Sequence, residues 1–480
     1  MNLKMIFNTI GKVALIEVGL LILPLITAII YSESTFVSIL ITMGIALLIG
    51  LLLVLLFKPK DRVIYPREGF AIVALAWIIL SIIGCLPFVI SGEIPSFIDA
   101  LFETVSGFTT TGASILNDVE SLSKSLLMWR SFTHWVGGMG ILVFVVAIMP
   151  KNSDRSIHIL RAEMPGISVD KIVPRAKDTA KILYFIYIGL TAMLTILLAF
   201  GEMDLYESLT HAFATAGTGG FTIKNTGLVG YSTYSQWVIA IFMLLFGVNF
   251  NLYFLILVGK FKAVLKNKEF LTYILIILSA TIFICLNVYP SIRNINDLIR
   301  HSFFQVSSIM TTTGFATYDF NTWNLPSQIL LLLLMFIGGS AGSTAGGLKV
   351  SRVMLLFKRI RFEIKKLINP NSVQILSLDG KKIDESTANG VTSYFCIYMV
   401  LLAVILMLIS FDGFDLMTNF SASVACFNNI GPGFSLVGPM SNYSCYSDFS
   451  TIVLTFAMLL GRLEIYPLLL ALTPTFWLKK

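Results

Sequence analysis

The stretch SFIDALFETVSGFTTTGAS, residues 96–114, decides the fold because a short apolar helix leads directly into a threonine–glycine turn. A helix that crosses a bilayer needs about 20 mostly apolar residues, and this one is shorter. Non-helical backbone is tolerated at membrane depth only where protein buries it or where it lines a watery cavity. If the surrounding chain is membrane-embedded, the stretch predicts a re-entrant half-helix; a single TTTG turn could also be a simple loop cap.

The composition indicates a membrane protein that crosses the bilayer several times. Of the 480 residues, 56% are hydrophobic and only 13% are charged, whereas soluble domains carry about 25% charged residues. So little charge would leave a soluble surface covered with apolar patches. The net charge of +7 does not indicate a nucleic-acid partner, because the basic residues lie in short loops between apolar runs.

Ten apolar runs are long enough to be membrane spans, and their loops predict the orientation. Of the 34 Lys and Arg residues, 27 lie at the termini and in the loops on one side. Cytoplasmic loops are enriched in Lys and Arg, so both termini are predicted to be cytoplasmic. The runs are 11–31, 36–57, 69–91, 126–149, 179–200, 234–258, 271–289, 325–337 continuing into 348–357, 389–410 and 447–477.

The opening stretch recurs three more times on the side opposite the termini. The copies are LYESLTHAFATAGTGGFT (205–222), LIRHSFFQVSSIMTTTGFAT (298–317) and FDLMTNFSASVACFNNIGPGFS (414–435). Aligning the turns brings Gly112, Gly220, Gly314 and Gly431 into register, and four copies favour a functional turn over a loop cap. Four re-entrant turns predict a pseudo-fourfold arrangement around one axis.

A ring of four such turns is suited to binding a bare cation. Backbone carbonyls can replace the hydration shell of an ion, glycine allows the dihedral angles this requires, and the negative ends of the short helices favour a cation. The predicted filter residues are Thr110, Thr111, Gly112, Thr218, Gly219, Gly220, Thr312, Thr313, Gly314, Asn429, Ile430 and Gly431. The carbonyls predicted to hold potassium are those of Thr111, Gly112, Gly219, Gly220, Thr313, Gly314, Ile430 and Gly431.

The motifs TTTGAS, GTGGFT, TTTGFA and NNIGPGF resemble those of the Trk/Ktr/HKT superfamily of potassium transporters, and the two extra N-terminal helices resemble its TrkH branch. The resemblance implies a homodimer that works with a cytosolic nucleotide-binding regulatory ring (TrkA-like). It also implies potassium selectivity, because Gly rather than Ser stands at the first filter position, Gly112. Gly219 beside Gly220, and Asn429–Ile430 in place of Thr–Thr, predict a filter that is not truly fourfold.

The second helix of the third repeat is interrupted by GGSAGSTAGGLK, residues 338–349. Each Gly weakens a helix by about 1 kcal/mol relative to Ala, so a loop is predicted, and its place next to the pore suggests a gate; TrkH-like chains imply the same. A kinked helix remains the alternative, and a phosphate-binding loop fails because Lys349 does not directly follow Gly347. The predicted gate residues are Gly338, Gly339, Gly342, Ser343, Thr344, Gly346, Gly347 and Arg462.

Arg462 lies inside the last apolar run, where a charge is costly and indicates a function or a partner. We expect it to project into the pore below the filter, near the 338–347 loop; a structural pair between two helices is the alternative. Glu17 and His134 are interpreted as packing or interface groups. Lys349 and Arg352 are interpreted as charges at a cytoplasmic helix end.

The predicted fold is therefore an all-α integral membrane fold with four helix–pore-loop–helix repeats in a pseudo-fourfold arrangement, preceded by two extra transmembrane helices. The predicted division is 1–68 for the two extra helices; 69–150, 178–258, 271–360 and 389–478 for the repeats; and 151–177, 259–270 and 361–388 for cytoplasmic loops.

The predicted function is potassium uptake across the plasma (inner) membrane through this pore, with the potassium ion bound at the filter and no organic cofactor in this chain. The basic loops could bind membrane lipid. An enzyme is not expected, because no nucleophile–base pair or metal-ligand cluster is visible. A potassium symporter coupled to sodium or protons remains the alternative, although the repeats of such carriers are usually inverted.

Overall fold

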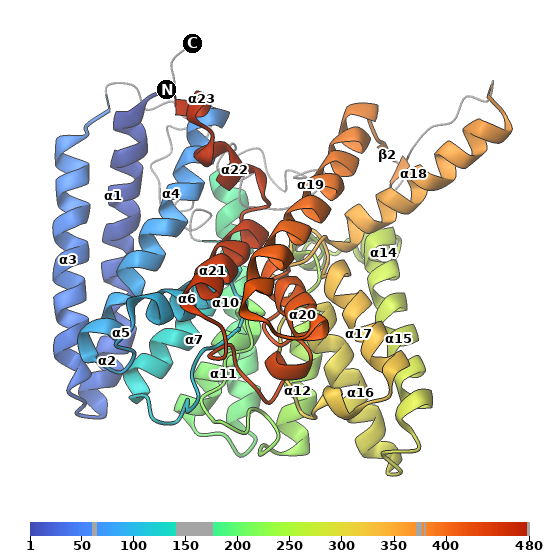
Figure 1. Ribbon diagram of the computed structural model, residues 1–480, viewed down its shortest axis with the longest axis horizontal. Helices are drawn as coiled ribbons and strands as arrows, with labels where there is room; N and C mark the ends of the chain where they lie inside the picture. The colour runs from blue at the N-terminus through green and yellow to red at the C-terminus, as the bar shows by residue number, and fades with distance from the viewer. Residues whose placement is uncertain (60–64, 141–175, 371–376, 379–380, 478–480) are drawn as a thin grey trace.

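The computed structural model describes residues 1–59, 65–140, 176–370, 377–378 and 381–477. Within these ranges the regular secondary structure is helical apart from one two-residue antiparallel pair, β1 (Ser377–Leu378) and β2 (Lys381–Lys382). The helices run mostly between two opposite ends of the molecule, and the first helix, which begins at Leu3, starts at the same end at which the last helix stops at Trp477 (Figure 1). We call this end the terminus-bearing face.

The chain begins with two spans that lie at one side of the molecule (Figure 1). They comprise α1 (Leu3–Leu20) with its near-continuous extension α2 (Ile22–Ile30), and α3 (Thr35–Leu56). One side of α3 carries exposed leucines such as Leu48 and Leu55. Because apolar side chains in the hydrocarbon of a bilayer face no water, this surface is suited to lipid contact.

Four repeats follow, each with a long first helix, a short pore helix and a second helix. Repeat 1 comprises α4 (Pro66–Gly84), α5 (Leu86–Ser91), α6 (Phe97–Phe108) and α7 (Lys124–Gly138). Repeat 2 comprises α10 (Ala176–Ala199), α11 (Leu205–Gly217), α12 (Thr233–Phe246), α13 (Phe250–Leu257) and α14 (Phe261–Leu265). Repeat 3 comprises α15 (Lys268–Val288), α16 (Ile295–Met310), η1 (Phe320–Thr322), α17 (Leu325–Ile337) and α18 (Val350–Ile368). Repeat 4 comprises α19 (Glu385–Ile409), η2 (Ser410–Asp412), α20 (Leu416–Phe427), η3 (Ser435–Val437), α21 (Asp448–Arg462), α22 (Tyr466–Leu472) and α23 (Pro474–Trp477).

The repeats close into a ring through one recurring contact. The second helix of each repeat packs against the pore helix of the next one: α7 on α11, α12 on α16, α17 on α20 and α21 on α6. The last of these contacts joins repeat 4 to repeat 1. The four pore helices α6, α11, α16 and α20 therefore lie around a common axis, which confirms the predicted pseudo-fourfold arrangement.

The pore helices begin where polar side chains cap them. Ser96, Asp204, Asn294 and Asp415 each accept a hydrogen bond from a backbone N–H in the first turn of α6, α11, α16 and α20 respectively. Such caps satisfy N–H groups that have no partner within the helix. The residues that follow their other ends, Thr110, Thr218, Thr312 and Asn429, are buried, so all four pore helices end inside the molecule.

Several predicted spans are composite helices rather than single ones. Among the described residues, six helices are long and apolar enough to cross a membrane, or seven if the bent pair α12 and α13 is one span. The run 234–258 bends by 92° between these two helices. The run 447–477 breaks after α21, where Glu464 and Ile465 have φ angles of 58° and 64°. A hydropathy average over a whole span does not detect such breaks, because the few polar residues at them, such as Asn249 and Glu464, are outweighed by the apolar residues on either side.

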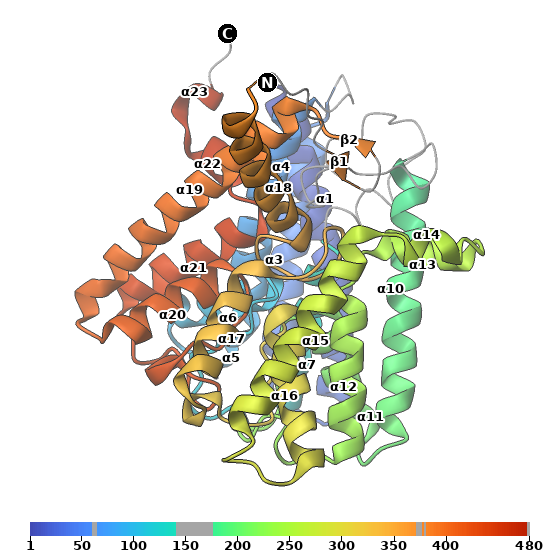
Figure 2. The ribbon, with the colours of Figure 1, turned by 90° about the vertical axis from the view of Figure 1, so that its right-hand side faces the viewer.

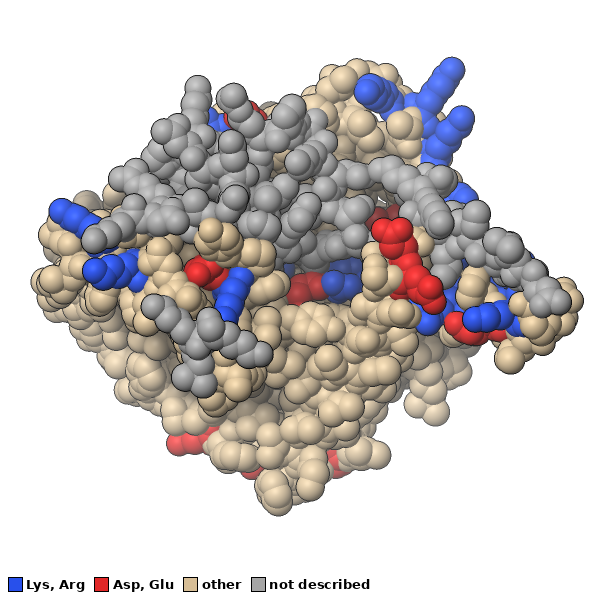
Figure 3. Space-filling view, turned by 90° about the horizontal axis from the view of Figure 1, so that it is seen from above, with Lys and Arg blue, Asp and Glu red and all other residues tan. Residues whose placement is uncertain are grey.

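The predicted boundaries at 150, 151–177 and 478 lie partly or wholly outside the described residues. The predicted loop 259–270 contains the helix α14 and the start of α15, and the predicted loop 361–388 contains the last turns of α18 and the start of α19. The basic end of α18 therefore projects from the terminus-bearing face (Figure 1). Lys and Arg side chains gather along the margin of this face (Figure 3).

Candidate filter and gate

The turns that follow the four pore helices have the same backbone conformation. The first turn residue is left-handed, with φ angles of 56°, 56°, 55° and 57° at Thr110, Thr218, Thr312 and Asn429. Two residues later comes a left-handed glycine, with φ angles of 76°, 78°, 84° and 98° at Gly112, Gly220, Gly314 and Gly431. The four turns thus share one backbone conformation, and the predicted departure from fourfold symmetry concerns their side chains, since Gly219 and Ile430 stand where the other two turns have Thr111 and Thr313.

The same hydrogen bond shapes each turn. The residue between the two left-handed positions donates its backbone N–H to a carbonyl five residues earlier in the pore helix. The pairs are Thr111 to Ser106 at 2.8 Å, Gly219 to Ala214 at 2.9 Å, Thr313 to Ser308 at 2.8 Å and Ile430 to Ala425 at 2.9 Å. Because these bonds use only backbone atoms, the side chains of the turns can differ without changing their shape.

The four glycines and their neighbours form a closed ring. A Cβ added to each glycine would overlap the carbonyl oxygen of the next turn, which is a contact that no side chain tolerates. The separations are 1.8 Å from Gly112 to Gly219 O, 2.0 Å from Gly220 to Thr313 O, 2.1 Å from Gly314 to Ile430 O and 2.6 Å from Gly431 to Thr111 O. Glycine is therefore required at all four positions for steric as well as conformational reasons.

This arrangement suits a dehydrated cation more than any other ligand. Four carbonyl oxygens lie at the ring, those of Thr111, Gly219, Thr313 and Ile430, and the carbonyl ends of four pore helices are directed at it. The threonine hydroxyls serve as tethers: Thr111 bonds Thr109 at 2.8 Å, and Thr313 bonds Thr311 at 2.8 Å. Among the described residues, no group of three or more His, Cys, Asp or Glu side chains could hold a metal ion.

A cavity of about 290 Å³ lies directly on the side of the ring away from the termini. Its lining includes all four ring glycines together with polar residues that follow the turns, among them Asn225 and Asn442. A hydrated ion fits in such a space, so the cavity leads to the ring from this side.

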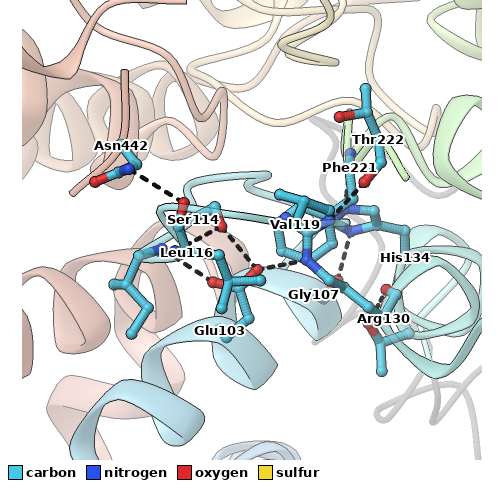
Figure 4. A network of polar contacts seen from close by, with 12 residues as sticks. Glu103, Gly107, Ser114, Leu116, Val119, Arg130, His134, Phe221, Thr222 and Asn442 are labelled. Carbon is cyan, nitrogen blue, oxygen red and sulfur yellow. Dashed lines mark hydrogen bonds and ion pairs between the residues drawn. The ribbon is translucent and has the colours of Figure 1, made fainter. Parts of the chain in front are cut away.

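A buried polar network braces the first two turns (Figure 4). Arg130 Nε lies 2.5 Å from Glu103 Oε1, and both side chains are almost fully buried. Glu103 accepts hydrogen bonds from Ser114 Oγ and the Ile115 N–H, each at 3.1 Å, while Arg130 donates to the Thr222 carbonyl at 2.8 Å. The pair therefore joins the segment after turn 1 to the segment after turn 2.

His134 on α7 provides a second brace in the same network (Figure 4). Its Nδ1–H donates to the Gly107 carbonyl at 2.8 Å, and its Nε2 accepts from the Phe221 N–H at 3.3 Å. His134 was predicted to be a packing or interface group. It is buried as a packing group would be, and its imidazole also bonds the backbone of the turn segments, which the sequence did not predict. Sequence reasoning missed Glu103 and Arg130 as well; a carboxylate inside an apolar pore helix was the available signal.

The predicted gate segment is a loop, which excludes the kinked helix: α17 ends at Ile337 and α18 begins at Val350. It folds back on itself, since the Val350 N–H donates to the Gly339 carbonyl at 3.0 Å. It also contacts the filter, because the Gly346 N–H donates to Thr312 Oγ1 at 2.6 Å. The loop lies against the turns of repeats 3 and 4, on their terminus-bearing side.

Arg462, at the end of α21, joins this loop to repeat 1. Its guanidinium donates to the Thr344 carbonyl at 2.9 Å, to the Gly138 carbonyl at 2.8 Å and to the Gly137 carbonyl. The three acceptors are backbone groups from two different repeats. Arg462 thus lies where it was expected, near the loop, and these bonds are to carbonyls rather than to an acidic partner.

Two charges at the start of α18 have contacts that the sequence did not predict. Lys349 is buried, at 3% exposure, and its ammonium bonds the Ala345 carbonyl within the loop. Arg352 forms an ion pair with Glu464 and lies 4.2 Å from the centre of the Tyr394 ring. Both residues lie at the start of α18, where the broken helix resumes, and the prediction that this is a cytoplasmic helix end stays a prediction; the broken last span turns Glu464 toward α18 and provides the partner of Arg352.

The space on the terminus-bearing side of the ring is small. A cavity of about 40 Å³ is lined by Gly346, Lys349, Asn429 and Arg462, among others. A water molecule needs about 10–15 Å³ by this kind of measure, so only a few waters fit. The ring therefore has a wide cavity on one side and a filled passage on the other.

Comparisons with known proteins agree with this arrangement. The family model described as TrkH, cation transport protein, matches residues 37–478. The Trk system potassium uptake protein TrkH of Escherichia coli K12 is 37% identical, with 99% of this chain and 100% of that protein covered. The protein of the same name from Vibrio parahaemolyticus is 33% identical over 99% of this chain and all of its own length. The crystal structure of the potassium transporter TrkH from Vibrio parahaemolyticus matches with a TM-score of 0.90, 32% identity and complete coverage of both chains.

These relatives are named as transport proteins, which points to a transporter rather than an enzyme. The apolar helices and the matched family together make the chain a membrane protein that crosses the bilayer several times. The chain therefore belongs to the TrkH cation transport protein family.

Proposed function

We propose that this chain is the membrane subunit of a potassium uptake system and conducts the ion along the axis of its four repeats. The observation that carries the proposal is the closed ring of four equal turns, in which each glycine lies against the carbonyl of the next turn. The names of the relatives support the choice of potassium as the ion. Binding at such a ring must compensate for dehydration and yet allow release.

The filter in this proposal consists of the predicted turn residues, with Thr111, Gly219, Thr313 and Ile430 supplying the carbonyls nearest the ring. The residues on either side of them hold the turns in shape. The repeat boundaries at 69–150, 178–258, 271–360 and 389–478 belong to the same proposal. An ion would enter from the 290 Å³ cavity.

The gate in this proposal is the loop 338–349 held by Arg462. The bonds from Arg462 to Thr344 and Gly138 support it, because they fix the loop beneath the filter. A cation that passes the ring would meet the guanidinium and the buried ammonium of Lys349, which raises the electrostatic barrier. Opening then requires the loop and Arg462 to separate.

The proposal also covers orientation and partners. The basic segments support a cytoplasmic terminus-bearing face, since cytoplasmic loops are rich in Lys and Arg. The word "system" in the names of the relatives supports a complex with regulatory subunits. Within it we place a homodimer of this chain and a cytosolic nucleotide-binding ring that acts on the gate from this face.

The filter assignment is tested by reversal potentials of the purified protein in lipid bilayers, with potassium on one side and sodium on the other. The wild type should reverse close to the potassium equilibrium potential. Gly112→Ser should move the reversal potential toward zero, because the added side chain displaces the Gly219 carbonyl. Gly92→Ser is the matched control, since Gly92 has a similar φ of 78° but open space around it.

Equal permeability of the wild type to both ions would overturn the potassium filter. A reversal potential that follows an imposed sodium or proton gradient would instead support the symporter.

The gate assignment is tested with Gly346→Ala. A Cβ at this position would lie 2.4 Å from the Asn428 carbonyl, so the loop must move away from the filter, and basal flux should rise. Gly390→Ala is the control, because nothing lies within 4 Å of the added atom. Unchanged flux in Gly346→Ala would contradict a gate at this loop.

A further inference from the structure

The bend in the second helix of repeat 2 places two short helices across the direction of the spans. The axes of α12 and α13 differ by 92°, and α14 continues the sideways course before α15 begins at Lys268. Figure 2 shows α13 and α14 projecting from the side of the molecule, at the upper ends of α12 and α15. Because α15 is itself a span, α13 and α14 lie at the level where the span leaves the hydrocarbon.

The side chains of this segment are mixed in a way that suits an interface between lipid and water. Leu257, Phe261 and Leu265 are 73%, 57% and 66% exposed. The exposed lysines Lys260 and Lys262 lie between them, and Lys266 follows. Helices with exposed apolar and basic residues lie in the plane of a membrane, with the apolar groups at the acyl boundary and the lysines among the headgroups.

The charge of the segment favours anionic headgroups over neutral ones. Residues 250–268 contain no Asp or Glu, and the next residue, Glu269, is buried and bonded to the Ala341 N–H at 2.7 Å. The lysines therefore have no acidic neighbour along this segment. A bilayer with anionic lipids attracts such a basic segment, and the attraction falls off within a Debye length of the surface.

The same segment is bonded at both ends to the loop 338–349. At its start, the Phe250 N–H donates to the Gly342 carbonyl at 3.0 Å, and the Ser340 N–H donates to the Gly247 carbonyl at 3.0 Å. At its end, Glu269 accepts from the Ala341 N–H. A displacement of α13 and α14 relative to the membrane would therefore pull on the loop.

We propose that residues 250–266 form a binding site for anionic phospholipid headgroups, and that lipid bound there stabilises the loop in the position beneath the filter. This proposal rests on the gate assignment above. A ligand shifts a conformational equilibrium toward the state that it binds better. The lipid-bound segment holds residues 246–250 and Glu269 in place, so the lipid favours the closed conformation.

The test compares rubidium uptake into vesicles of phosphatidylcholine alone and vesicles that also contain phosphatidylglycerol. Basal uptake by the wild type should fall as the anionic lipid is added. A K260Q/K262Q/K266Q variant should lose this inhibition, because the affinity of the segment for the anionic lipid should fall by about fivefold for each lysine removed. The control is R361Q/K365Q/K366Q, which removes three exposed cations from α18 on the same face and should keep the inhibition.

A second readout does not depend on transport. In Phe261→Trp, the added indole fluorescence, taken as the difference from the parent protein, should be quenched by phosphatidylglycerol with a nitroxide headgroup. Nitroxide-labelled phosphatidylcholine should quench it less, and the three-lysine variant should remove the difference. Absence of uptake in the wild type would contradict the proposed function while leaving the quenching as the test of the lipid site.

Equal quenching by the two labelled lipids would overturn the lipid site. Inhibition of the three-lysine variant equal to that of the wild type would overturn its coupling to the loop, and would leave this surface to a protein partner.

Discussion

The four turns proposed as the filter and the single loop proposed as the gate use glycine in opposite ways. In the turns, glycine allows one conformation that is repeated four times, with each glycine against the carbonyl of its neighbour. In the loop, glycine interrupts one helix in one repeat, and the fourfold pattern ends there. A site for a spherical ion gains from equal contacts on all sides, whereas a gate needs only one repeat to move.

The two regions also differ in what holds them. The filter turns are bonded to their own pore helices through backbone atoms. The loop is held by groups from elsewhere: Thr312 of the filter, Arg462 of repeat 4 and the break in repeat 2. The turns thus share one local bond, to which Glu103, Arg130 and His134 add braces at turns 1 and 2, whereas the contacts that fix the loop in place come from other parts of the chain.

The largest expected effect comes from substitutions that test whether the four glycine–carbonyl contacts of the ring are equally close. Gly112→Ala should reduce uptake by about 10- to 100-fold, because overpacking costs about 1–3 kcal/mol and the added Cβ would lie 1.8 Å from a backbone oxygen. Gly431→Ala, where the separation is 2.6 Å, should retain more uptake. Rubidium uptake into vesicles measures both, with Gly92→Ala as the control. Equal losses at Gly112 and Gly92 would mean that the left-handed backbone, and not the ring contact, is essential.

A smaller effect is expected when the loop proposed as the gate loses its bonds to Arg462. Arg462→Ala removes three bonds from a charged group to carbonyls, and each such bond contributes about 1.5–3 kcal/mol. Basal uptake without any partner protein should rise by about tenfold or more. Arg359→Ala is the control, because Arg359 bonds Asn389 on the surface rather than the loop. Uptake that stays at the wild-type level would place Arg462 outside the gate.

The smallest effect is expected for two equivalent turn residues, of which one contacts the loop 338–349. Thr110 and Thr312 occupy the same turn position with φ angles of 56° and 55°. Thr312 Oγ1 accepts a bond from the loop, whereas Thr110 Oγ1 is buried without a partner. Thr312→Val should therefore raise basal uptake by about fivefold.

Thr110→Val should leave basal uptake unchanged, and neither variant should move the reversal potential. The same rise in both variants would show that the hydroxyl acts on the turn and not on the loop.

The sequence predictions that the structure confirms concern features that a short stretch of chain determines by itself. Apolar runs identify helices because each must match a bilayer, and the four glycines align because each turn needs the same backbone. The interruption at residues 338–349 could be read from its five glycines alone. The predicted roles of the filter and gate residues stay predictions, for which the reversal and uptake measurements are the test.

The tertiary structure decided what depends on residues far apart in the chain. The closure of repeat 4 onto repeat 1 appears only when the carbonyl of Thr111 meets Gly431. The partner of Arg352 is Glu464, 112 residues away, because a break in the last span redirects that carboxylate. The 92° bend that brings α13 to the loop 338–349 likewise appears only in the folded chain. Sequence thus determined the repeated unit and its arrangement around one axis, since four copies of one local pattern predict both, and only the folded chain determined which contacts close the ring and which charges meet.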